Sequence, residues 1–581
     1  MNKLNLTPNA LRVLENRYLK KNEQGKVIET PHEMFRRVAH AVASAELLYD
    51  GRNLEQIEQE FFNIMANLEF LPNSPTLMNA GTDIGQLSAC FVLPVGDSME
   101  QIFGAVKAMA IIHQSGGGTG FSFSNLRPKG DVVKSTGGVA SGPVSFMRVF
   151  DTATEVIKQG GRRRGANMGI LRVDHPDILE FIQAKEKEEL LENFNLSVAV
   201  TDKFIETVAK DSEYFLVNPR TYKKVAKLNA NRVFDLIVKN AWKTGDPGVI
   251  FIDEINRHNP TPEVGKIEST NPCGEQPLLP YESCNLGSIN LSKMVMNKQI
   301  DWEKLRQIVK KAIHFLDNVI DVNKYPLPEI EKITKSNRKI GLGVMGFAEM
   351  LIQLGIPYDS DEALLIGERL MNFITTEAKK KSVELGSKRG SFSNFDKSVW
   401  KGKGYKSMRS ATVTTVAPTG SIGIIADASS GIEPLFAVAF VRQIMGGLVE
   451  VNKFFEDIAK QKKFYTKELM DEIVDKGTIR DIEYIPEGIR RLFATALDIS
   501  PEMHVRIQAA FQKYTENAVS KTVNLPNSAT PVDIKNVYLL AYELKCKGIT
   551  VYRYGSKKEQ VLYTNVEVSS DYSRGCRICS V

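Results

Sequence analysis

The chain has 581 residues, of which 43% are hydrophobic and 25% charged, and its formal net charge is +6. This is the composition of a globular protein, and the length fits either several domains or one large α/β barrel. No run of about 18 apolar residues predicts a membrane span. No long basic block indicates a nucleic-acid partner, so the small positive charge suits anionic small molecules.

The first 70 residues predict a helical region. Apolar residues recur with a spacing near 3.6 in EMFRRVAHAVASAELLY (33–49) and in NLEQIEQEFFNIMANLEF (53–70). The N-terminus has neither the apolar core nor the cleavage site of a signal peptide, so we expect a cytoplasmic protein. At LPNSPTLMNAG (71–81) the composition changes to Pro, Gly, Asn and small residues, and we place a domain boundary there.

Residues 71–555 predict a domain in which strands and helices alternate. The expected strands are 248–253, 339–347, 411–418, 520–526 and 548–554, and the expected helices are 233–245, 304–322 and 531–548. Alternation of this kind favours an α/β sheet or barrel. Residues 556–581 are polar and without periodicity, which indicates a mobile tail.

Asp97 precedes the segment SMEQIFGAVKAMAIIHQ and has Glu100 three residues later. This spacing predicts a capping box at the start of a helix. Two basic, glycine-rich segments follow, at 127–142 and 158–168. Flexible basic loops attract anions, so a nucleotide phosphate is a natural partner for them, with a solvated loop as the alternative.

Cys273 lies between an amide and a carboxylate in Asn271-Pro-Cys-Gly-Glu275, and Cys284 follows soon after. Six cysteines in the whole chain are too few for a disulfide framework, and in a reducing cytosol such residues are buried, metal-binding or catalytic. On a loop bent by Pro and Gly, the carboxylate could act as a base and the amide could hold a substrate hydroxyl. A buried cysteine in a tight turn is the alternative interpretation.

The segment ATVTTVAPTGSIGIIADASSGIEP (411–434) predicts a strand that runs into the turn Pro418-Thr419-Gly420-Ser421. Backbone N–H groups at such a turn can bind a phosphate. The segment lacks the Gly-Lys-Ser/Thr ending of a Walker A motif. A plain strand and turn is the alternative.

The tail ends in Cys576-Arg-Ile-Cys579. Such a pair suits a redox dithiol, in which one thiol attacks and the other resolves. Zinc is the alternative, but a structural zinc site needs about four ligands and no second close cysteine pair exists. The seven histidines predict no metal centre, because there is no His-Glu-x-x-His and the one Glu-x-x-His, from Glu29 to His32, contains a proline.

Six segments together resemble the large catalytic subunit of ribonucleotide reductase: LPNSPTLMNAG, SACFVLPVGDSM, NPCGE, SCNLGSINL, APTGS and SGIEP. NPCGE followed closely by SCNLG is highly specific in that order. The resemblance covers about residues 70 to 555 and the tail. It implies a ten-stranded α/β barrel with NPCGE on an internal loop (71–555) and a flexible redox-active tail (556–581), which follow the helical region predicted above for residues 1–70.

The resemblance also implies roles for the cysteines and their neighbours. Cys273 would carry a thiyl radical that abstracts the 3′-hydrogen of a ribonucleotide, while Glu275 takes the 3′-hydroxyl proton and Asn271 binds the sugar. Cys90 and Cys284 would form a disulfide as the 2′-hydroxyl leaves as water. Cys576 and Cys579 would then reduce that disulfide and be reduced in turn by a thioredoxin-type protein. Cys546 matches no role in the family, and we interpret it as structural.

By the same resemblance, two nucleotide sites are expected. The substrate, expected to be a diphosphate, would contact Thr76, Ala89, Pro418, Thr419, Gly420 and Ser421. Deoxynucleoside triphosphate effectors would bind near Asp97, Lys158, Arg162, Arg163 and Arg164. The helix after Asp97 would form the contact of a homodimer, because dimeric relatives bind the effector at their interface.

The radical source follows from what the chain lacks. Tyr552 and Tyr554 are separated by Arg553, and no Tyr-Tyr pair exists in the chain, whereas oxygen-dependent members use such a pair. A glycyl radical motif and a zinc cysteine cluster are also absent. The VYRYGS ending, the ACFVLPVGDSM block and the GGRRRGANMG loop resemble the class that uses adenosylcobalamin. That class is therefore expected, without a protein metal site. The alternatives are an oxygen-dependent large subunit with a diiron partner and a nucleotide-sensing relative without catalysis.

Overall fold

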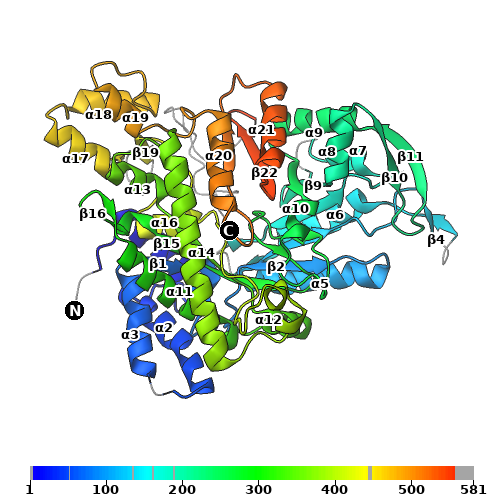
Figure 1. Cartoon of the computed structure of the whole chain (residues 1–581), viewed down its shortest axis with the longest axis horizontal. Helices are drawn as coiled ribbons and strands as arrows, with labels where there is room; N and C mark the ends of the chain where they lie inside the picture. The colour runs from blue at the N-terminus through cyan, green and yellow to red at the C-terminus, as the bar shows by residue number, and fades with distance from the viewer. Residues whose placement is uncertain are drawn as a thin grey trace.

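The structure is a computed structural model that describes residues 4–51, 53–133, 137–159, 163–186, 190–442 and 448–556. The predicted effector residue Arg162 and the predicted tail cysteines Cys576 and Cys579 lie outside these ranges. Figure 1 shows the strands at the centre of the molecule, the N-terminal helices at the lower left and a small helical group at the upper left.

The N-terminal region is helical, as the sequence predicted. It contains α1 (Pro8–Val13), a π-helix (Leu14–Tyr18), α2 (Pro31–Ala43), a 3-10 helix (Ser44–Leu48) and α3 (Leu54–Ala66). A capping box at Thr30 and Glu33 starts α2, with a proline in its first turn. The predicted segment 33–49 is therefore divided, because its last turn tightens into a 3-10 helix.

One half of the barrel is a run of parallel strands. Its members, in spatial order, are β2 (Cys90–Pro94), β3 (Gly118–Ser122), β8 (Asn167–Arg172), β9 (Phe194–Val200) and β12 (Gly248–Phe251). Only the last of these was predicted from the sequence. The others are buried almost throughout, and strands buried on both faces lack the alternation that identifies a strand.

The other half is built from later segments: β15 (Ser283–Asn290), β18 (Ile340–Met345), β21 (Thr522–Leu525) and β22 (Gly548–Arg553). Within it, β15 is parallel to β18 and β21 to β22. The halves join antiparallel at two seams, β2 with β15 and β12 with β22. A short strand, β1 (Phe70–Pro72), is added antiparallel to β15 in this ten-stranded sheet.

The sheet closes through a segment that forms no continuous strand. Residues 411–418 were predicted as a strand, but they form single parallel bridges, Leu342 to Thr414 and Val416 to Val519. Thr415, between the two bridges, donates its hydroxyl to the carbonyl of Glu275 in an internal loop. The N–H of Val413 donates to the side chain of Glu516 and so is not available to a neighbouring strand. Because these bridges connect β18 to the residues before β21, the sheet is a closed barrel, and the predicted fold class is confirmed.

Helices cover the outside of the barrel. They include α5 (Met99–Gln114), α6 (Pro143–Val156), α8 (Asp202–Ala209), α9 (Ala230–Thr244), α11 (Trp302–Val322), α12 (Pro328–Asn337), α13 (Phe347–Leu354), α14 (Asp361–Arg389), α20 (Pro501–Gln512) and α21 (Pro531–Glu543). The prediction missed α14, which has 29 residues and runs down the front of the molecule in Figure 1. No described helix is long and apolar enough to cross a membrane.

Short elements complete the described chain. The short helices are α4 (Ser74–Asn79), α7 (Ile178–Ile182), α10 (Ile252–Arg257), α15 (Val399–Gly402), α16 (Gly420–Ala426), α17 (Lys453–Gln461), α18 (Lys467–Lys476) and α19 (Glu487–Leu492), with 3-10 turns at Leu291–Lys293 and Phe395–Lys397. The short antiparallel pairs are β4 (Val132–Val133) with β5 (Gly138–Val139), β6 (Lys158–Gln159) with β7 (Arg163–Arg164), β10 (Glu213–Val217) with β11 (Lys224–Asn229), β13 (Ser269–Thr270) with β14 (Pro277–Leu278), β16 (Val295–Met296) with β17 (Gln299–Ile300), and β19 (Ala439–Arg442) with β20 (Leu448–Val451).

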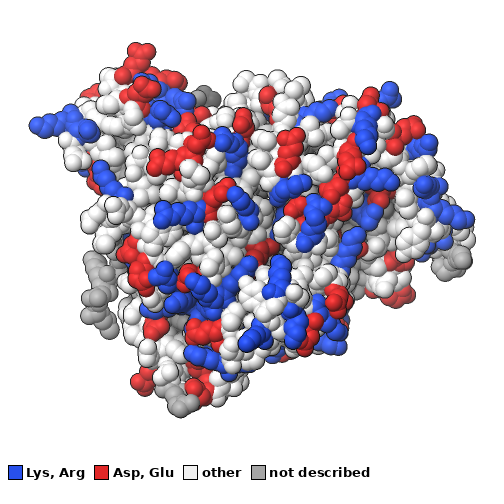
Figure 2. Space-filling view, viewed as in Figure 1, with Lys and Arg blue, Asp and Glu red and all other residues white. Residues whose placement is uncertain are grey.

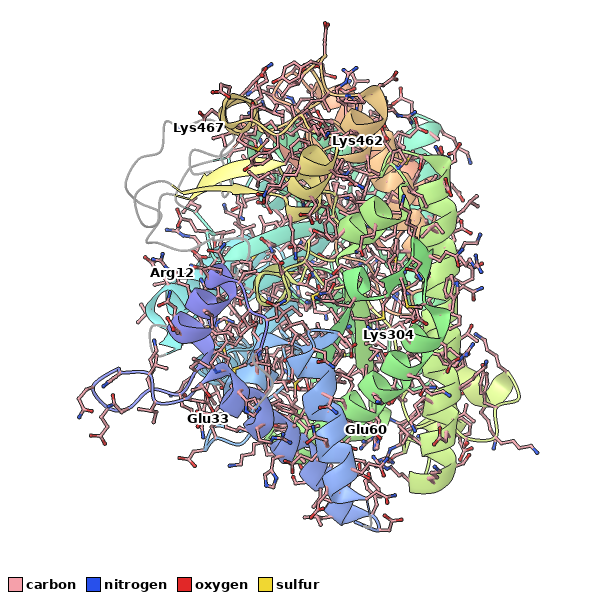
Figure 3. All side chains as sticks on the ribbon, turned by 90° about the vertical axis from the view of Figure 1, so that its left-hand side faces the viewer. Arg12, Glu33, Glu60, Lys304, Lys462 and Lys467 are labelled. Carbon is pink, nitrogen blue, oxygen red and sulfur yellow. The ribbon has the colours of Figure 1, made fainter. Side chains whose placement is uncertain are left out.

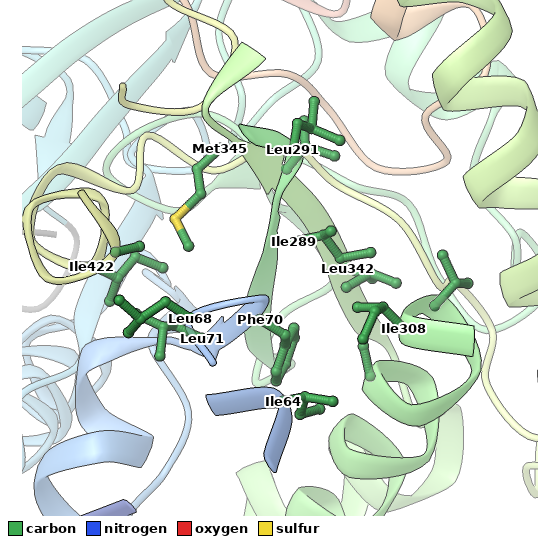
Figure 4. Close-up of a cluster of buried hydrophobic side chains, with 14 of the residues drawn as sticks. Ile64, Leu68, Phe70, Leu71, Ile289, Leu291, Ile308, Leu342, Met345 and Ile422 are labelled. Carbon is green, nitrogen blue, oxygen red and sulfur yellow. The ribbon is translucent and has the colours of Figure 1, made fainter. Parts of the chain in front are cut away.

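The N-terminal helices share a hydrophobic core with one half of the barrel. Figure 4 shows Ile64 and Phe70 packed near Ile289 of β15, Leu342 of β18 and Ile308 of α11. A single core of this kind holds the helical region and the barrel as one body, because separating them would expose apolar surface to water.

A separate, smaller core supports the helical group at the upper left of Figure 1. It contains apolar residues of α13, α17, α18 and α19. Figure 3 places Lys462 and Lys467 of this group at the opposite end of the molecule from Glu33 and Glu60 of the N-terminal helices. Basic and acidic side chains are interspersed over the face in Figure 2, in keeping with the small net charge.

Candidate active site

The predicted NPCGE segment forms a loop between β13 and β14 that closes on itself through Asn271. Its backbone N–H donates to the carbonyl of Gln276 at 3.2 Å, and its Oδ1 accepts from the Gln276 N–H at 2.9 Å. Its carbonyl accepts from the N–H of Gly274 at 3.1 Å. Gly274 has φ +80°, a conformation that glycine adopts without strain. The loop therefore has a fixed shape that depends on Asn271 and Gly274.

Glycines of β3 allow the loop to lie against the inside of the barrel. A Cβ placed on Gly120 would come 1.7 Å from the carbonyl oxygen of Thr270, and one on Gly118 would come 3.0 Å from the ring of Pro272. Any other residue at position 120 would therefore push the loop away from the strand. The GGGTG run of the sequence is explained by this close approach of two backbones.

The loop is also anchored from the remaining sides of the barrel. Asn195 of β9 donates its side-chain N–H to the carbonyl of Pro272 at 2.8 Å. The carbonyl of Glu275 accepts from the hydroxyl of Thr415 and from the N–H of Ala518, each at 2.9 Å. Both barrel halves therefore fix the loop, which holds its side chains in one place.

Two buried thiols face the loop. Cys90 of β2 and Cys284 of β15 are directly paired across the antiparallel seam, and both are 0% exposed. The Asn271 Nδ2 donates to the Cys90 sulfur at 3.2 Å, and the Cys90 thiol donates to Glu275 Oε1 at 3.9 Å. The structure thus brings Cys90, which is distant in the sequence, together with Asn271, Glu275 and Cys284.

The protonation of the buried groups suits hydrogen and proton transfer. Burial raises the pKa of Glu275 to about 7, against the lowering effect of hydrogen bonds from Asn271 and Cys90. Burial also raises the pKa of the Cys284 thiol well above its ordinary value. Glu275 can therefore exchange a proton near neutral pH, and Cys284 keeps its hydrogen until it reacts.

Cys273 differs from the other two thiols because it is only half-buried. A Cβ placed on the next residue, Gly274, would meet no atom within 4 Å. Open space therefore adjoins the loop at Gly274, the residue next to Cys273. Of the three thiols, Cys273 is partly exposed, whereas Cys90 and Cys284 are fully buried.

A pocket borders the loop. Its lining includes the predicted substrate residues Ala89, Pro418 and Thr419 together with Glu275. The remaining lining residues are Asn73, Ser74, Pro75, Leu286, Gly287, Ser288, Ala417 and Ile422. Glu275 Oε2 is buried and has no hydrogen-bond partner among the described residues, so it offers a free acceptor to a substrate hydroxyl.

The predicted phosphate turn has a constrained backbone. Thr419 has φ +55°, which is uncommon for a β-branched residue, and it is the N-cap of α16. Its Oγ1 accepts from the N–H of Gly431 at 2.7 Å. The predicted residues Gly420 and Ser421 are the first two of α16, where N–H groups lack partners within the helix.

The SGIEP motif supports this turn from behind. Its Glu433 pairs with Lys521 at 2.6 Å, and the Lys521 amine also lies 2.9 Å from His504 Nδ1. Burial lowers the pKa of Lys521, while the charge of Glu433 raises it. The motif therefore joins the turn to β21 and α20 through buried polar contacts.

Thr76 lies behind the pocket. It is 1% exposed, and its hydroxyl lies 2.9 Å from Asn73 Oδ1 and 3.0 Å from the carbonyl of Leu87. Its backbone N–H donates to the same Asn73 oxygen at 3.0 Å. Thr76 is absent from the pocket lining, whereas Asn73 and Ser74 of the same segment form part of it.

The predicted effector residues are partly described. The sequence suggested Asp97 as the cap of α5, and this prediction is wrong. Ser98 occupies the N-cap and accepts from the N–H of Gln101. Asp97 instead accepts from the side chain and the backbone N–H of Arg127 at 2.8 and 3.0 Å. Lys158 belongs to β6, and Arg163 and Arg164 form β7, which pairs with β6.

Several lining residues escaped the sequence analysis for different reasons. Asn73 and Ser74 lie in LPNSPTLMNAG, a segment that drew attention only to its threonine. Gly287 and Ser288 lie in SCNLGSINL, where the sequence predicted a role for Cys284 alone. Asn73 carries a local signal, because an Asn three residues before Thr76 is the pattern of a helix N-cap.

Matches to family models cover most of the chain. The model described as the ribonucleotide reductase barrel domain matches residues 88–552. The model described as the ribonucleotide reductase all-alpha domain matches residues 4–85.

Individual relatives agree with these matches. A protein of Thermoplasma acidophilum named vitamin B12-dependent ribonucleoside-diphosphate reductase is 52% identical over 96% of this chain and 80% of its own length. A protein of the same name from Mycobacterium tuberculosis is 50% identical over 99% of this chain and 84% of its own. The solved class Id ribonucleotide reductase alpha subunit of Actinobacillus ureae has the same fold, with a TM-score of 0.78, 24% identity, and coverage of 95% of this chain and 97% of that one.

Proposed function

The chain belongs to the ribonucleotide reductase large-subunit family, and we propose that it reduces ribonucleoside diphosphates to 2′-deoxyribonucleotides with adenosylcobalamin as its cofactor. The observation that carries this proposal is the position of two buried thiols beside one loop. Cys90 and Cys284 are paired across the seam, and Cys90 contacts the loop that bears Asn271, Cys273 and Glu275. The relatives at 50–52% identity are named B12-dependent diphosphate reductases. Their names favour this cofactor over the diiron partner that the sequence left open.

Cys273 is the hydrogen-abstracting residue of the proposed reaction. Adenosylcobalamin, when bound, supplies the radical that removes a hydrogen atom from the Cys273 thiol. Half-burial of this thiol beside open space fits a cofactor of that size. The thiyl sulfur abstracts the 3′-hydrogen of the substrate and returns it at the end, so Cys273 is unchanged after each turnover.

Glu275 and Asn271 manage the proton and the sugar. A substrate 3′-hydroxyl placed in the pocket can donate to the unpartnered Glu275 Oε2. The pKa of about 7 lets this carboxylate accept the proton near neutral pH. Asn271, held by the Gln276 N–H, keeps Cys90 and the sugar in register. The barrel interior excludes water from the radical.

Cys90 and Cys284 supply the two electrons. Their thiols lose two hydrogens, the substrate loses its 2′-hydroxyl as water, and one disulfide forms. Direct pairing of the two residues across the seam supports this step without a large backbone movement. We propose that Cys576 and Cys579 reduce this disulfide by thiol exchange and are then reduced by a thioredoxin-type protein.

The substrate would lie in the pocket with its phosphates toward Pro418, Thr419, Gly420 and Ser421. Glu275 is the only carboxylate in the lining, and a phosphate avoids it because like charges repel. Ala89 would contact the nucleoside. Thr76, behind Asn73, would act by holding that residue in place.

Deoxynucleotide effectors would bind at Asp97, at residues 127–142 and at the β6–β7 loop with Lys158, Arg162, Arg163 and Arg164. A path from this loop to the active site supports the proposal. The carbonyl of Ala166 accepts from the N–H of Thr119 on β3 at 3.1 Å. The adjacent Gly118 packs under Pro272 of the catalytic loop, so a shift of the effector loop can reach Cys273.

A homodimer would form through α5. This helix exposes Met99 and Phe103 at 56% and 47%, and exposed apolar side chains on a helix mark a protein contact. Phe103→Asp should therefore give a monomer by sedimentation, and an unchanged oligomer would remove α5 from the interface.

A cytoplasmic location would keep the cysteine pairs supplied with reductant.

The proposed function is tested by one turnover without external reductant. The fully reduced chain, given a ribonucleoside diphosphate, adenosylcobalamin and no thiol, should form deoxynucleotide and a disulfide. Peptide mapping should find Cys90 linked to Cys284 in Cys576→Ser/Cys579→Ser, where the tail cannot exchange. Product formation with both thiols still reduced would contradict the assignment.

A further inference from the structure

The buried amide of Asn73 lacks a partner where one is expected. Asn73 is 7% exposed, and its Nδ2 has no hydrogen-bond partner among the described residues. A buried donor without an acceptor costs free energy, so a retained one indicates a partner that arrives later. Asn73 lines the same pocket as Glu275, whose Oε2 is the other unpartnered atom there.

The orientation of this amide is fixed by its neighbours. Asn73 Oδ1 accepts from the backbone N–H of Thr76 at 3.0 Å, and a backbone N–H can only donate. The oxygen must therefore face Thr76, and the nitrogen cannot be exchanged with it. The backbone N–H of Asn73 donates to the carbonyl of Leu286 at 2.8 Å. These two hydrogen bonds fix the position of the amide, and its Nδ2 has no partner among the described residues.

The hydroxyls beside Asn73 already make hydrogen bonds. The Ser74 hydroxyl lies 2.8 Å from the hydroxyl of Tyr18 in the N-terminal region, and either of the two can be the donor. The Thr76 N–H and hydroxyl both face Asn73. Nδ2 of Asn73 is the side-chain nitrogen of this wall that has no partner among the described residues.

We propose that Asn73 Nδ2 donates a hydrogen bond to a phosphate oxygen of the substrate and is a specificity-determining residue of the site. The inference rests on the proposed function, and it transfers the contact expected for Thr76 to the residue that Thr76 positions. Glu275 stands at the sugar end of the pocket beside Cys90. Charge repulsion places the phosphates away from it, toward the walls formed by Asn73 and Thr419.

Asn73→Asp tests the proposal because it changes the donor and keeps the cap. Aspartate is as good an N-cap as asparagine, and its Oδ1 can accept from Thr76 as before. The second oxygen would replace Nδ2 and face a phosphate. Asn452→Asp is the matched control, since Asn452 caps α17 through the N–H groups of Phe454 and Phe455 outside the pocket.

The measurement is the dissociation constant of a labelled ribonucleoside diphosphate and of its nucleoside, with the full chain and without cofactor. We expect Asn73→Asp to weaken diphosphate binding by at least about tenfold, the loss typical of one hydrogen bond to a charged group. Nucleoside binding should change less than about threefold. Both constants are measured at a temperature where the variant is folded, because a buried carboxylate lowers stability. Asn452→Asp should bind both ligands normally.

Two results would overturn the inference. Diphosphate binding by Asn73→Asp within twofold of the wild type would make Asn73 a cap alone. Equal weakening of diphosphate and nucleoside would place the amide at the sugar or base. If the aspartate variant fails to fold, Asn73→Ser keeps a capping oxygen and removes the amide Nδ2, and the same two criteria apply to it. A wild-type chain that binds no ribonucleoside diphosphate would contradict the proposed function instead.

Discussion

Two buried carboxyl sites in this molecule have opposite electrostatics. Glu275 and Asp317 are each 0% exposed. Burial raises the pKa of Glu275 to about 7, and no cation among the described residues opposes this rise. Burial would also raise the pKa of Asp317, but Arg338 and Arg409 outweigh this effect and the pKa is lowered. The difference lies in the partners that the fold supplies, because the burial is the same.

The Asp317 site joins the N-terminal region to the barrel. Arg338 and Arg389 contact Asp317 at 2.6 and 3.0 Å, and Arg389 also pairs with Glu46 of the N-terminal region at 2.6 Å. Arg409 contacts Asp317 at 3.0 Å. Every charge here has a partner, which suits a structural joint. The Glu275 site leaves an oxygen unpartnered, which suits a reaction.

The largest effect on activity should come from Cys273→Ser. A serine hydroxyl cannot easily form the oxygen analogue of a thiyl radical, so we expect no measurable turnover. Nucleotide binding should persist, because the substitution barely changes the loop. Steady-state product formation and equilibrium binding measure the two properties. Substantial turnover by this variant would remove Cys273 from the reaction, and Cys546→Ala is a control outside the site.

Glu275→Gln sharpens the contrast between the two sites. Loss of the base should reduce turnover by about 10²- to 10⁴-fold. Stability should stay equal or rise, because a neutral amide avoids the cost of burying a charge. Kinetics and thermal unfolding on one preparation are sufficient. A variant that is both active and less stable would make Glu275 a structural residue.

Asp317→Asn should have the reverse profile. Removing one partner from a buried ion cluster leaves arginine charges uncompensated, so we expect a loss of about 3–5 kcal/mol in stability. At temperatures where the variant stays folded, turnover should fall less than about threefold. Denaturant unfolding gives the stability change. An unchanged midpoint would show that Asp321 and Glu46 compensate for the lost charge.

Gly120→Ala should disturb the catalytic loop without a charge change. Its Cβ would meet the carbonyl of Thr270 at 1.7 Å, so the loop must move, and displacement of about 1 Å can cost about 10²-fold in rate. Gly402→Ala is the control, since a Cβ there meets no atom within 4 Å. Equal activity of the two variants would mean that the loop tolerates displacement.

The smallest effects should appear on titration. Glu275 must be ionised to accept a proton, so kcat/KM should fall as pH drops through about 7. Because its pKa is raised in the folded state, the protonated carboxyl favours folding and its ionisation opposes folding. The stability that the protonated form contributes is fully present below about pH 4.5 and is lost as pH rises through about 7. Glu46 shows the opposite sign. Burial acts to raise its pKa, but hydrogen bonds from His314 and Arg389 prevail and lower it to about 2.

The stability that Glu46 contributes is therefore present when the pH is above the ordinary pKa of a glutamate, and it is lost as pH falls toward 2. Unfolding midpoints from pH 3 to 8, with Glu275→Gln as reference, separate the two contributions. A kcat/KM profile that is flat between pH 6 and 8 would contradict the role of Glu275 as the base.

The sequence predicted the parts of the site that are contiguous. NPCGE places Asn271, Cys273 and Glu275 on one turn, so their proximity needs no tertiary information. The partner cysteines came from a resemblance in motif order, and the barrel from the alternation of strands and helices. These features are local or repeated, which is why one sequence suffices to recognise them.

The remaining features depend on contacts between distant segments. Gly120 is required by the backbone of Thr270, and Asn73 lines the same pocket as Glu275 because β1 pairs with β15 in the closed barrel. Asp317 looks like an ordinary helical residue until three arginines from other elements surround it. The irregular segment 411–418 likewise depends on distant residues, because the Val413 N–H donates to the side chain of Glu516.

The most direct test of the proposed reaction is cofactor dependence in the purified full chain. A ribonucleoside diphosphate is incubated with dithiothreitol and an effector, with and without adenosylcobalamin, and no second protein is added. We expect 2′-deoxynucleoside diphosphate to accumulate over many turnovers with the cofactor and none to form without it. No product with the cofactor, or product that requires an iron-containing partner in its absence, would contradict the reaction proposed for Cys273.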